Sequence, residues 1–331
     1  MAVLLFFNQW KREFIGDFFP EYNLFYLKRK NYIKFIFKQL VNKNYTLIIW
    51  GYNEAPKYKK IFNKAIKLIR VEDGFLRSTE LGKKRSKPLS LAADFTGLYF
   101  NSSAPSDLEN LLNFHDFSSQ EILHAKECME LIKKYGVSKY NHAPKISLSS
   151  LIGSKKRKRI LVIGQVEQDA SIRYGCAKPI TNNDLVKLAH AENPDCEIIY
   201  KIHPDVLAAI ENNPASFTEI SSICTVIASD IAPSALFAEV EKVYTITSLM
   251  GFEALIFGLP VICVGAPFYS NWGITDDRQP IERRIRKRTL EEIFCAAYLL
   301  YPRYPYGNIL SIIEQLGCVN KLKEKTEDLV F

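Results

Sequence analysis

The sequence contains no apolar run that approaches the roughly 20 residues a membrane-spanning helix needs. Its opening residues, MAVLLFFNQWKREF, lack an early basic region and a small-residue cleavage site, so we expect no secretory signal. The seven cysteines are scattered and include no Cys-x-x-Cys pair. Such spacing is typical of buried thiols in a reducing compartment, not of a disulfide framework or a zinc site. These absences together predict a cytoplasmic protein.

Recognisable nucleic-acid-binding motifs are also missing, because no zinc finger, helix-turn-helix or RNA-recognition signature is present. The chain nevertheless carries a net charge of +8, with basic clusters at residues 83–87, 155–159 and 283–288. Positive charge favours anionic partners, and an anionic sugar nucleotide beside an anionic membrane accounts for it as well as nucleic acid does. The histidines are dispersed and there is no Asp-x-Asp pair, so no metal is expected.

What is present is an ordered α/β pattern, with 47% hydrophobic and 24% charged residues in a chain long enough for two Rossmann-sized cores. In the first half, the hydrophobic spacing predicts helices over residues 22–42, 57–66 and 106–135 and strands over residues 45–50 and 67–71. The alternation of strand and helix is typical of a parallel sheet.

A boundary is expected near residues 136–158, where proline, glycine, serines and a basic run coincide. After it, we predict strands over residues 159–164, 197–202, 224–228, 242–246 and 261–264 and helices over residues 251–257 and 290–300, the last crossing back toward the first half. The predicted fold is α/β and GT-B-like: two Rossmann-like domains, residues 1–150 on the acceptor side and 151–331 on the nucleotide side, whose parallel sheets face a cleft.

The first candidate site is Glu72-Asp73-Gly74 with Arg77, directly after the strand at residues 67–71. Ligands of open α/β sheets bind at the carboxyl ends of the strands. Two adjacent carboxylates suit acid/base catalysis, because their repulsion in a cleft raises one pKa. The alternative is a plain turn whose acids pair with Arg70 or Arg77.

A second polar set, Gln165, Glu167 and Asp169, follows the strand at residues 159–164. Polar side chains that alternate where a buried strand ends are typical of a site. The alternative is a capped helix start with Asp169 or Ser171 as the N-cap.

The third motif, Lys201-Ile202-His203-Pro204, ends the strand at residues 197–202. The proline fixes the exit of the chain and directs the imidazole out of the sheet. In a transferase-like fold this favours a phosphate contact, whereas a lone histidine is more often structural.

The fourth motif opens the stretch TSLMGFEALIFGLPVICVGAPFYSNWGITDD. The N-terminus of a helix presents unpaired N–H groups and a positive dipole end, so Thr247, Ser248 and Gly251 there can hold a phosphate. Glu253, expected in the first turn, can reach ribose hydroxyls, and residues 269–277 can close over the base or the sugar. Taken alone, the run also fits an ordinary helix-to-strand connection.

Together, Glu-Asp-Gly, His-Pro and the serine motif are similar to bacterial sialyltransferases, which use CMP-activated acid sugars. The longer phrases RVEDGFLRS, GQVEQDASIRYG, KIHPDV and RRIRKRTLEEIFCAAYLLYPRYP, with the stretch above, resemble the capsule polysaccharide synthesis family more closely. That family contains the retaining β-Kdo transferases of the KpsC type. The resemblance runs in order from about residue 69 to 306, and residues 1–65 carry no motif we can place.

The resemblance implies the donor CMP-β-Kdo and transfer with retained anomeric configuration. It makes Asp169 the nucleophile of a two-step displacement and Glu72 the acid/base that activates the acceptor hydroxyl, while His203 contacts the CMP phosphate. Glu167 is the alternative nucleophile. Position 168 is glutamine, where the resemblance leads us to expect an acid.

For the binding residues, the resemblance implies that Ser248 holds phosphate and Glu253 the ribose, with Lys201 and Arg173 adding positive charge near the sugar carboxylates. The other residues expected to bind substrate are Asp73, Gly74, Arg77, Gln165, Glu167, Pro204, Thr247 and Gly251. No cofactor or metal is expected. The acceptor is a saccharide or glycolipid of a bacterial surface polysaccharide, with a peripheral membrane contact left open, and the chain holds one transferase module where the capsule enzymes carry two.

Two other functions stay open. An inverting, sialyltransferase-like enzyme would use Glu72 or Asp73 as a base and form no covalent intermediate. A non-catalytic capsule-assembly protein would bind anionic lipid or polysaccharide through the basic clusters and the aromatic, basic helix expected over residues 22–42.

Overall fold

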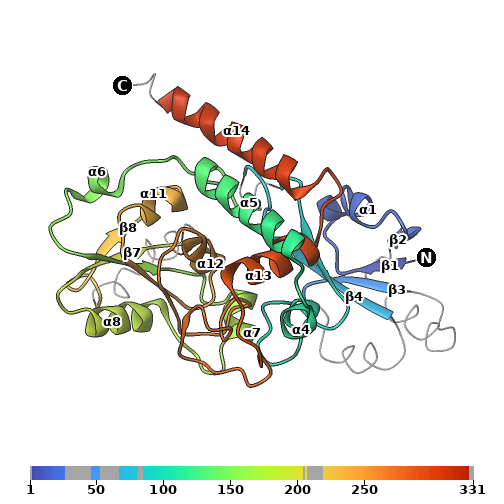
Figure 1. The fold of residues 1–331 in the computed structure, drawn as a ribbon, viewed down its shortest axis with the longest axis horizontal. Coiled ribbons are helices and arrows are strands. Elements are labelled where there is room, and N and C mark those ends of the chain that lie inside the picture. Colours follow the sequence, from blue (N-terminus) through green and yellow to red (C-terminus); the bar gives the residue numbers. More distant parts are fainter. Residues whose placement is uncertain are drawn as a thin grey trace.

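The computed structural model describes residues 2–26, 46–52, 67–80, 85–203, 206 and 219–327, with side chains to residue 321. Its strands form two six-stranded sheets (Figure 1). The predicted GT-B-like architecture of two α/β units is confirmed. No helix in the described part of the chain is long and apolar enough to cross a membrane.

The first sheet is mixed, with the strand order β12-β5-β4-β3-β1-β2. Four neighbouring strands are parallel: β1 (Ala2–Leu5), β2 (Leu24–Tyr26), β3 (Thr46–Trp50) and β4 (Lys67–Asp73). The strand β5 (Leu91–Asp94) pairs antiparallel with β4, and β12 (Pro302–Arg303) pairs antiparallel with β5. Every residue of β1 and β3 is buried, as expected of central strands covered on both faces.

Two expectations for this half are wrong in part. Residues 24–26, placed at the start of a helix, form the strand β2 and pair with β1, because one turn of apolar spacing does not distinguish a helix from an edge strand. Strand β4 continues two residues beyond the predicted end, so Glu72 and Asp73 lie on the strand itself. Residues 27–45 and 53–66, with most of the first predicted helix and the second, lie outside the described residues.

The helix predicted over residues 106–135 is two helices, α4 (Asp107–Phe114) and α5 (Ser119–Tyr135). Ser106 caps α4, its side chain accepting a hydrogen bond from the N–H of Glu109. A second cap interrupts the run, because Ser118 and Glu121 form a capping box that starts α5. The first half also holds a 3₁₀ turn, η1 (Gln9–Arg12), and the short helix α1 (Ile15–Phe18).

The second sheet is entirely parallel, with the order β11-β10-β9-β6-β7-β8. Its strands are β6 (Arg159–Ile163), β7 (Glu197–Lys201), β8 (Thr225–Ile227), β9 (Lys242–Thr245), β10 (Val261–Cys263) and β11 (Asp276–Asp277). The first five confirm the predicted strands to within a residue at either end. Between β6 and β10, the helices that the structure describes are α7 (Ala170–Gly175), α8 (Asn182–Glu192), α11 (Pro233–Phe237) and α12 (Leu249–Ile256).

The chain then returns to the first half, as the sequence predicted. Helix α13 (Leu290–Phe294) passes into a π-helical segment (Cys295–Leu300), after which β12 joins the first sheet. The long helix α14 (Ile309–Glu327) then lies along α5 (Figure 1). The predicted domain boundary between residues 150 and 151 falls within α6 (Leu148–Ile152).

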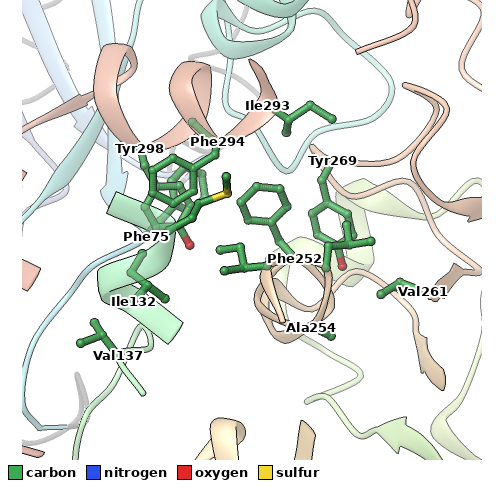
Figure 2. Packing of buried hydrophobic residues seen from close by; sticks show 14 of the residues in the cluster. Phe75, Ile132, Val137, Phe252, Ala254, Val261, Tyr269, Ile293, Phe294 and Tyr298 are labelled. Atoms are coloured by element: carbon green, nitrogen blue, oxygen red, sulfur yellow. The ribbon is translucent and has the colours of Figure 1, made fainter. Parts of the chain in front are cut away.

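Aromatic side chains from both halves share one core (Figure 2). Phe75, just beyond β4, stacks against Tyr298 of the π-helical segment with ring centroids 5.3 Å apart. Its ring also lies 4.7 Å from that of Phe268, which packs in turn on Phe252 of α12. This core fixes α12 of the second half against the carboxyl end of β4 in the first.

The basic cluster at residues 283–288 is largely engaged within the protein. Arg283 and Arg284 both pair with the buried carboxylate of Glu109 in α4. Arg284 also donates to the carbonyl oxygen of Ser270, and Arg288 to that of Leu112. These arginines hold α4 against the second half, and the exposed charge left for a partner is smaller than the sequence suggests.

Candidate functional site

Glu72 and Asp73 end β4 with different partners. The Oε1 atom of Glu72 accepts hydrogen bonds from Trp50 Nε1 and from the N–H of Asp73, each at 3.0 Å. The Oδ2 atom of Asp73 pairs with Arg77 Nε at 3.1 Å, so the pairing considered as the plain alternative holds for Asp73. Burial, reinforced by the charge of Asp73, raises the pKa of Glu72. A carboxyl with a raised pKa beside a strand end suits proton transfer.

The other oxygen of Asp73, Oδ1, is buried and has no hydrogen-bond partner in the described part of the chain. Gly74 allows Ser90 to approach the backbone closely, because a Cβ at this position would lie 2.2 Å from Ser90 Oγ. The buried guanidinium of Arg77 is fixed on its far side by Ser78 Oγ and Ser86 Oγ. Arg77 is therefore fixed in place and holds Asp73 through Oδ2, while Oδ1 of Asp73 accepts no hydrogen bond from the described residues.

Two lysines complete this group, and neither was predicted from the sequence. The Nζ atom of Lys11 lies 3.1 Å from the centroid of the Trp50 ring. Burial lowers the pKa of Lys11 to about 8, although Glu72 and Asp73 act in the opposite direction. For Lys139, burial acts to lower the pKa, but neighbouring groups that include Asp73 and Glu72 outweigh it and the pKa is raised. The site thus places two cations against two carboxylates.

Lys139 also joins this group to the second half. Its carbonyl oxygen accepts a hydrogen bond from the N–H of Arg77 at 3.1 Å. Its own N–H donates to Glu253 Oε1 at 2.8 Å. Glu253 is buried, and burial raises its pKa to about 7. Because α12 begins at Leu249, Glu253 lies in the second turn of the helix, whereas the sequence predicted the first.

The N-terminus of α12 is built around Ser248, whose side chain accepts from the N–H of Met250 as the N-cap. The hydroxyl of Tyr269 donates to the carbonyl oxygen of Ser248 at 2.5 Å. Gly251 is required by that tyrosine, because a Cβ there would lie 2.2 Å from Tyr269 Oη. The serine and glycine selected from the sequence thus shape the first turn of the helix.

The ends of β6 and β9 meet through Gln165 and Thr247. Gln165 Nε2 donates to Thr247 Oγ1 at 3.1 Å, and the N–H of Thr247 donates back to Gln165 Oε1 at 2.8 Å. Both residues are buried. The structure therefore brings two predicted motifs together, through a reciprocal pair of hydrogen bonds.

Glu167 and Asp169 both accept hydrogen bonds at the start of a helix. Glu167 Oε1 accepts from the backbone N–H and the side-chain amide of Asn182, at 2.8 and 3.1 Å, at the start of α8. Asp169 is the N-cap of α7, and its Oδ1 accepts from the N–H and the hydroxyl of Ser171. Asp169 is exposed, and its Oδ2 accepts no hydrogen bond from the described residues. The capping alternative is confirmed for Asp169, which leaves one oxygen available for chemistry.

Helix α7 is anchored to the first half at its other end. The ring of Tyr174 lies 4.8 Å from that of Tyr52, which follows β3. The carbonyl oxygen of Tyr174 accepts from the N–H of Ser102 at 3.0 Å. Arg173 is exposed, with its guanidinium carbon 5.7 Å from the centroid of the Tyr174 ring.

At the end of β7, Lys201 is buried and donates to the carbonyl oxygen of Ile202 at 3.0 Å. Burial lowers its pKa. His203 is partly buried, and its carbonyl oxygen accepts from the N–H of Val206. Pro204 lies outside the described residues.

The predicted residues thus form separate groups within the described part of the chain. Lys139 connects the carboxylates of β4 to Glu253, and Gln165 connects to Thr247. No described contact joins Asp169 to Glu72 or to His203. A pocket between α5, α11 and α14 is lined by other residues, among them Tyr140, Asn141, Lys145, Ser234 and Asn320.

Two facing α/β units, with polar groups gathered at the carboxyl ends of their strands, define the GT-B fold of glycosyltransferases. The family described as capsule polysaccharide biosynthesis protein matches residues 45–304. The chain belongs to this family.

Known relatives agree with this assignment. The chain is 44% identical to the lipopolysaccharide-processing protein LpsZ of Rhizobium meliloti, covering 93% of this chain and 70% of that protein. It is 37% identical to the capsule polysaccharide modification protein LipA of Neisseria meningitidis serogroup A, covering 78% of this chain but only 36% of LipA.

Two solved structures of Thermosulfurimonas dismutans KpsC are similar over nearly the whole chain. The β-Kdo 2,4 transferase is 34% identical with a TM-score of 0.82, covering 96% of this chain and 98% of that one. The β-Kdo 2,7 transferase is 31% identical with a TM-score of 0.77, covering 96% and 99%.

Proposed function

We propose that this protein is a retaining glycosyltransferase that moves β-Kdo from CMP-β-Kdo to a saccharide or glycolipid acceptor. The observation that carries the proposal is the match to two KpsC β-Kdo transferases over 96% of the chain. The chemistry at the end of β4 supports it independently, because Glu72 has a raised pKa and lies among paired charges.

In the first proposed step, the carboxylate of Asp169 attacks the anomeric carbon of Kdo, and the bond to the CMP phosphate breaks. The leaving CMP carries the electron pair away, and Asp169 holds the sugar as an ester. The exposed Oδ2 is the oxygen suited to attack, because Oδ1 is engaged by Ser171. His203 would stabilise the departing phosphate, with Lys201 adding positive charge.

In the second step, Glu72 takes the proton of the acceptor hydroxyl, whose oxygen attacks the same carbon and releases Asp169. Two inversions give net retention. Trp50 and the N–H of Asp73 hold the Glu72 carboxylate in one orientation. We propose that Asp73 Oδ1, which is buried and has no hydrogen-bond partner among the described residues, accepts a further hydroxyl of the acceptor once the site adjusts to it.

The nucleotide is proposed to lie at the start of α12, where Thr247, Ser248 and Gly251 shape the first turn. Glu253 would take ribose hydroxyls only if the site rearranged, because its side chain is buried and its Oε1 accepts from the N–H of Lys139. No metal enters this proposal. Since the chain spans 70% of LpsZ and 36% of LipA, its acceptor and any contact with the inner membrane are also proposals.

Incubation with CMP-Kdo generated in situ and a Kdo-terminated acceptor should release CMP, and NMR of the product should show the β configuration. A sharper test uses Glu72→Gln, which removes the base of the second step and should accumulate an adduct of one Kdo, visible by intact-protein mass spectrometry. Glu72→Gln combined with Asp169→Ala should carry none. If that adduct persists without Asp169 but disappears with Glu167→Gln, the nucleophile is Glu167.

The two KpsC neighbours differ in linkage, one a 2,4 and one a 2,7 transferase, so either linkage is compatible with the match. An inverting enzyme would release CMP with no protein adduct in any variant. A purely binding protein would hold CMP or saccharide without turnover, and Glu72→Gln would leave its behaviour unchanged.

A further inference from the structure

The N-terminal segment, which carries no recognised motif, reaches the proposed base. Strands β1, β3 and β4 are adjacent and parallel, so their carboxyl ends lie at one edge of the sheet. Trp50 ends β3 and Glu72 is near the end of β4, while the turn η1 follows β1 by a few residues. The topology alone therefore places η1 beside the two strand ends that carry the proposed base and its tryptophan partner.

Contacts fix this placement. The Nζ atom of Lys11, in η1, lies 3.1 Å from the centroid of the Trp50 ring, while the indole N–H of Trp50 donates to Glu72 Oε1 at 3.0 Å. Phe7, from the same segment, packs edge-on against Trp50 with centroids 5.7 Å apart. Trp50 therefore contacts two charged groups: the ammonium of Lys11 lies over the face of its ring, and the carboxylate of Glu72 accepts a hydrogen bond from the N–H at its edge.

A cation over the face of an indole is attracted by the electrons of the ring and draws electron density from it. The N–H at the edge then becomes a better donor to a negative acceptor. The positive charge also favours the ionised carboxylate directly across the short distance. Both effects act in the same direction on Glu72.

We propose that Lys11 is a positioning residue for this reaction, whose ammonium group over Trp50 keeps Glu72 ionised and oriented as the base. The proposal rests on the proposed function in making Glu72 the base. Lys11 itself contacts neither substrate nor the reacting atoms.

Other charged groups also face Glu72. Asp73, on the same strand, opposes its ionisation, and Arg77 partly offsets this by pairing with Asp73. Lys139 favours ionisation from the loop after α5, and the phenol of Tyr99 lies close enough to interact with Glu72. Of the two lysines, Lys11 lowers the pKa of Glu72 more than Lys139 does, which makes it the residue to test.

The test does not depend on turnover. The chain has three tryptophans, so 15N-indole labelling gives three N–H signals, and Trp50→Phe identifies that of Trp50 by its loss. The chemical shift of this signal should follow the ionisation of Glu72 with pH, and Glu72→Gln should abolish that titration. In Lys11→Met the midpoint should rise by about one pH unit, because a nearby positive charge is lost.

Two variants control for structure. Lys11→Arg keeps a cation over the ring and should keep the midpoint near that of the wild type. Lys321→Met removes a lysine from the face of Tyr135, 4.7 Å from the ring centroid, on the distant helix α14, and should leave the Trp50 signal unchanged. Should Lys11→Met not fold, Lys11→Gln replaces it in the comparison with Lys11→Arg.

The activity profile gives the second readout. In Lys11→Met the acid limb of kcat/KM should move to higher pH by about the same amount as the Trp50 midpoint. At pH values below the midpoint, Lys11→Met should therefore lower kcat/KM about tenfold, whereas at pH values well above the midpoint kcat/KM should change little. A merely structural role would lower the rate at every pH. An unchanged Trp50 midpoint in Lys11→Met overturns the proposal. Absence of CMP release by the wild type overturns only the proposed function, because the titration is measured without substrate.

Discussion

The burial of Glu253 makes the stability of the folded protein depend on pH. Its pKa is raised from 4.5 to about 7 in the folded protein, because burial penalises the charged form more than the N–H of Lys139 favours it. Between these values the folded state holds a proton that the unfolded state has released. The contribution of Glu253 to stability is therefore complete below about pH 4.5 and is lost as the pH rises to about 7.

Glu253→Gln should remove this dependence, since the amide oxygen can still accept from Lys139. Thermal unfolding at pH 8 should show the variant to be more stable than the wild type by about 3 kcal/mol at most, with little difference at pH 4.5. A variant less stable than the wild type at pH 8 would mean that the carboxylate is ionised and satisfied in the folded protein. Measuring CMP affinity on the same samples tests the predicted ribose contact separately.

At the same scale, the sequence identified the acidic and basic residues at and just beyond the end of β4, but it did not predict how they are arranged. Glu72, Asp73 and Arg77 stand out because charged residues directly follow an apolar run. Lys11 and Lys139 do not, because neither lies beside a recognisable strand end in the sequence. Their proximity to Glu72 depends on which strands are neighbours, and a single sequence does not encode that in any local pattern.

At the scale of elements, α7 is short enough that its two ends move together. Asp169 caps its start, and Tyr174, in its last turn, rests on Tyr52 of the first half. A helix of six residues spans about 9 Å, so a shift at Tyr174 is transmitted to the proposed nucleophile.

Tyr174→Ala should therefore lower kcat by more than about tenfold, since small misplacements of reacting groups are costly. Its effect on unfolding should be about 2 kcal/mol, that of a partly buried aromatic ring. Tyr174→Phe keeps the ring contacts and should retain both properties. Rates and urea unfolding of the two variants give the comparison, and equal losses of activity in both would contradict the role of ring packing.

Strands β6 to β10 of the second half were predictable because each is a compact apolar run, whereas the two-residue strand β11 was not predicted. In the first half the same reasoning mistook Leu24–Tyr26 for a helix, although these residues pair with β1. The apolar run at residues 2–5 is too short for its hydrophobic period to distinguish a strand from a helix. The break between α4 and α5 could have been predicted from the sequence, because Ser118 and Glu121 have the spacing of a capping box.

At the scale of the whole molecule, ion pairs of Glu109 connect α4 to the second half. It is buried and pairs with Arg283 and Arg284, and Arg284 is itself buried with carbonyl oxygens as its other partners. Removing one partner of a buried ion pair leaves an uncompensated charge.

Glu109→Ala should thus destabilise the protein by about 3–5 kcal/mol in urea unfolding. The matched control is Arg286→Met in the same basic cluster, whose pair with the exposed Asp116 is open to solvent, and it should leave the unfolding curve unchanged. A comparable loss in both variants would show that the cluster stabilises the protein through its overall charge.

The return of the chain to β12 has a consequence for how the protein is made. The first sheet receives its last strand from residues 302–303, and the hydroxyl of Tyr301 donates to the buried carboxylate of Asp94 in β5. During synthesis, the N-terminal half therefore leaves the ribosome with one sheet edge unfilled and a buried acid without this tyrosine. It completes its sheet only after residues 302–303 have been made, so the two halves do not mature independently.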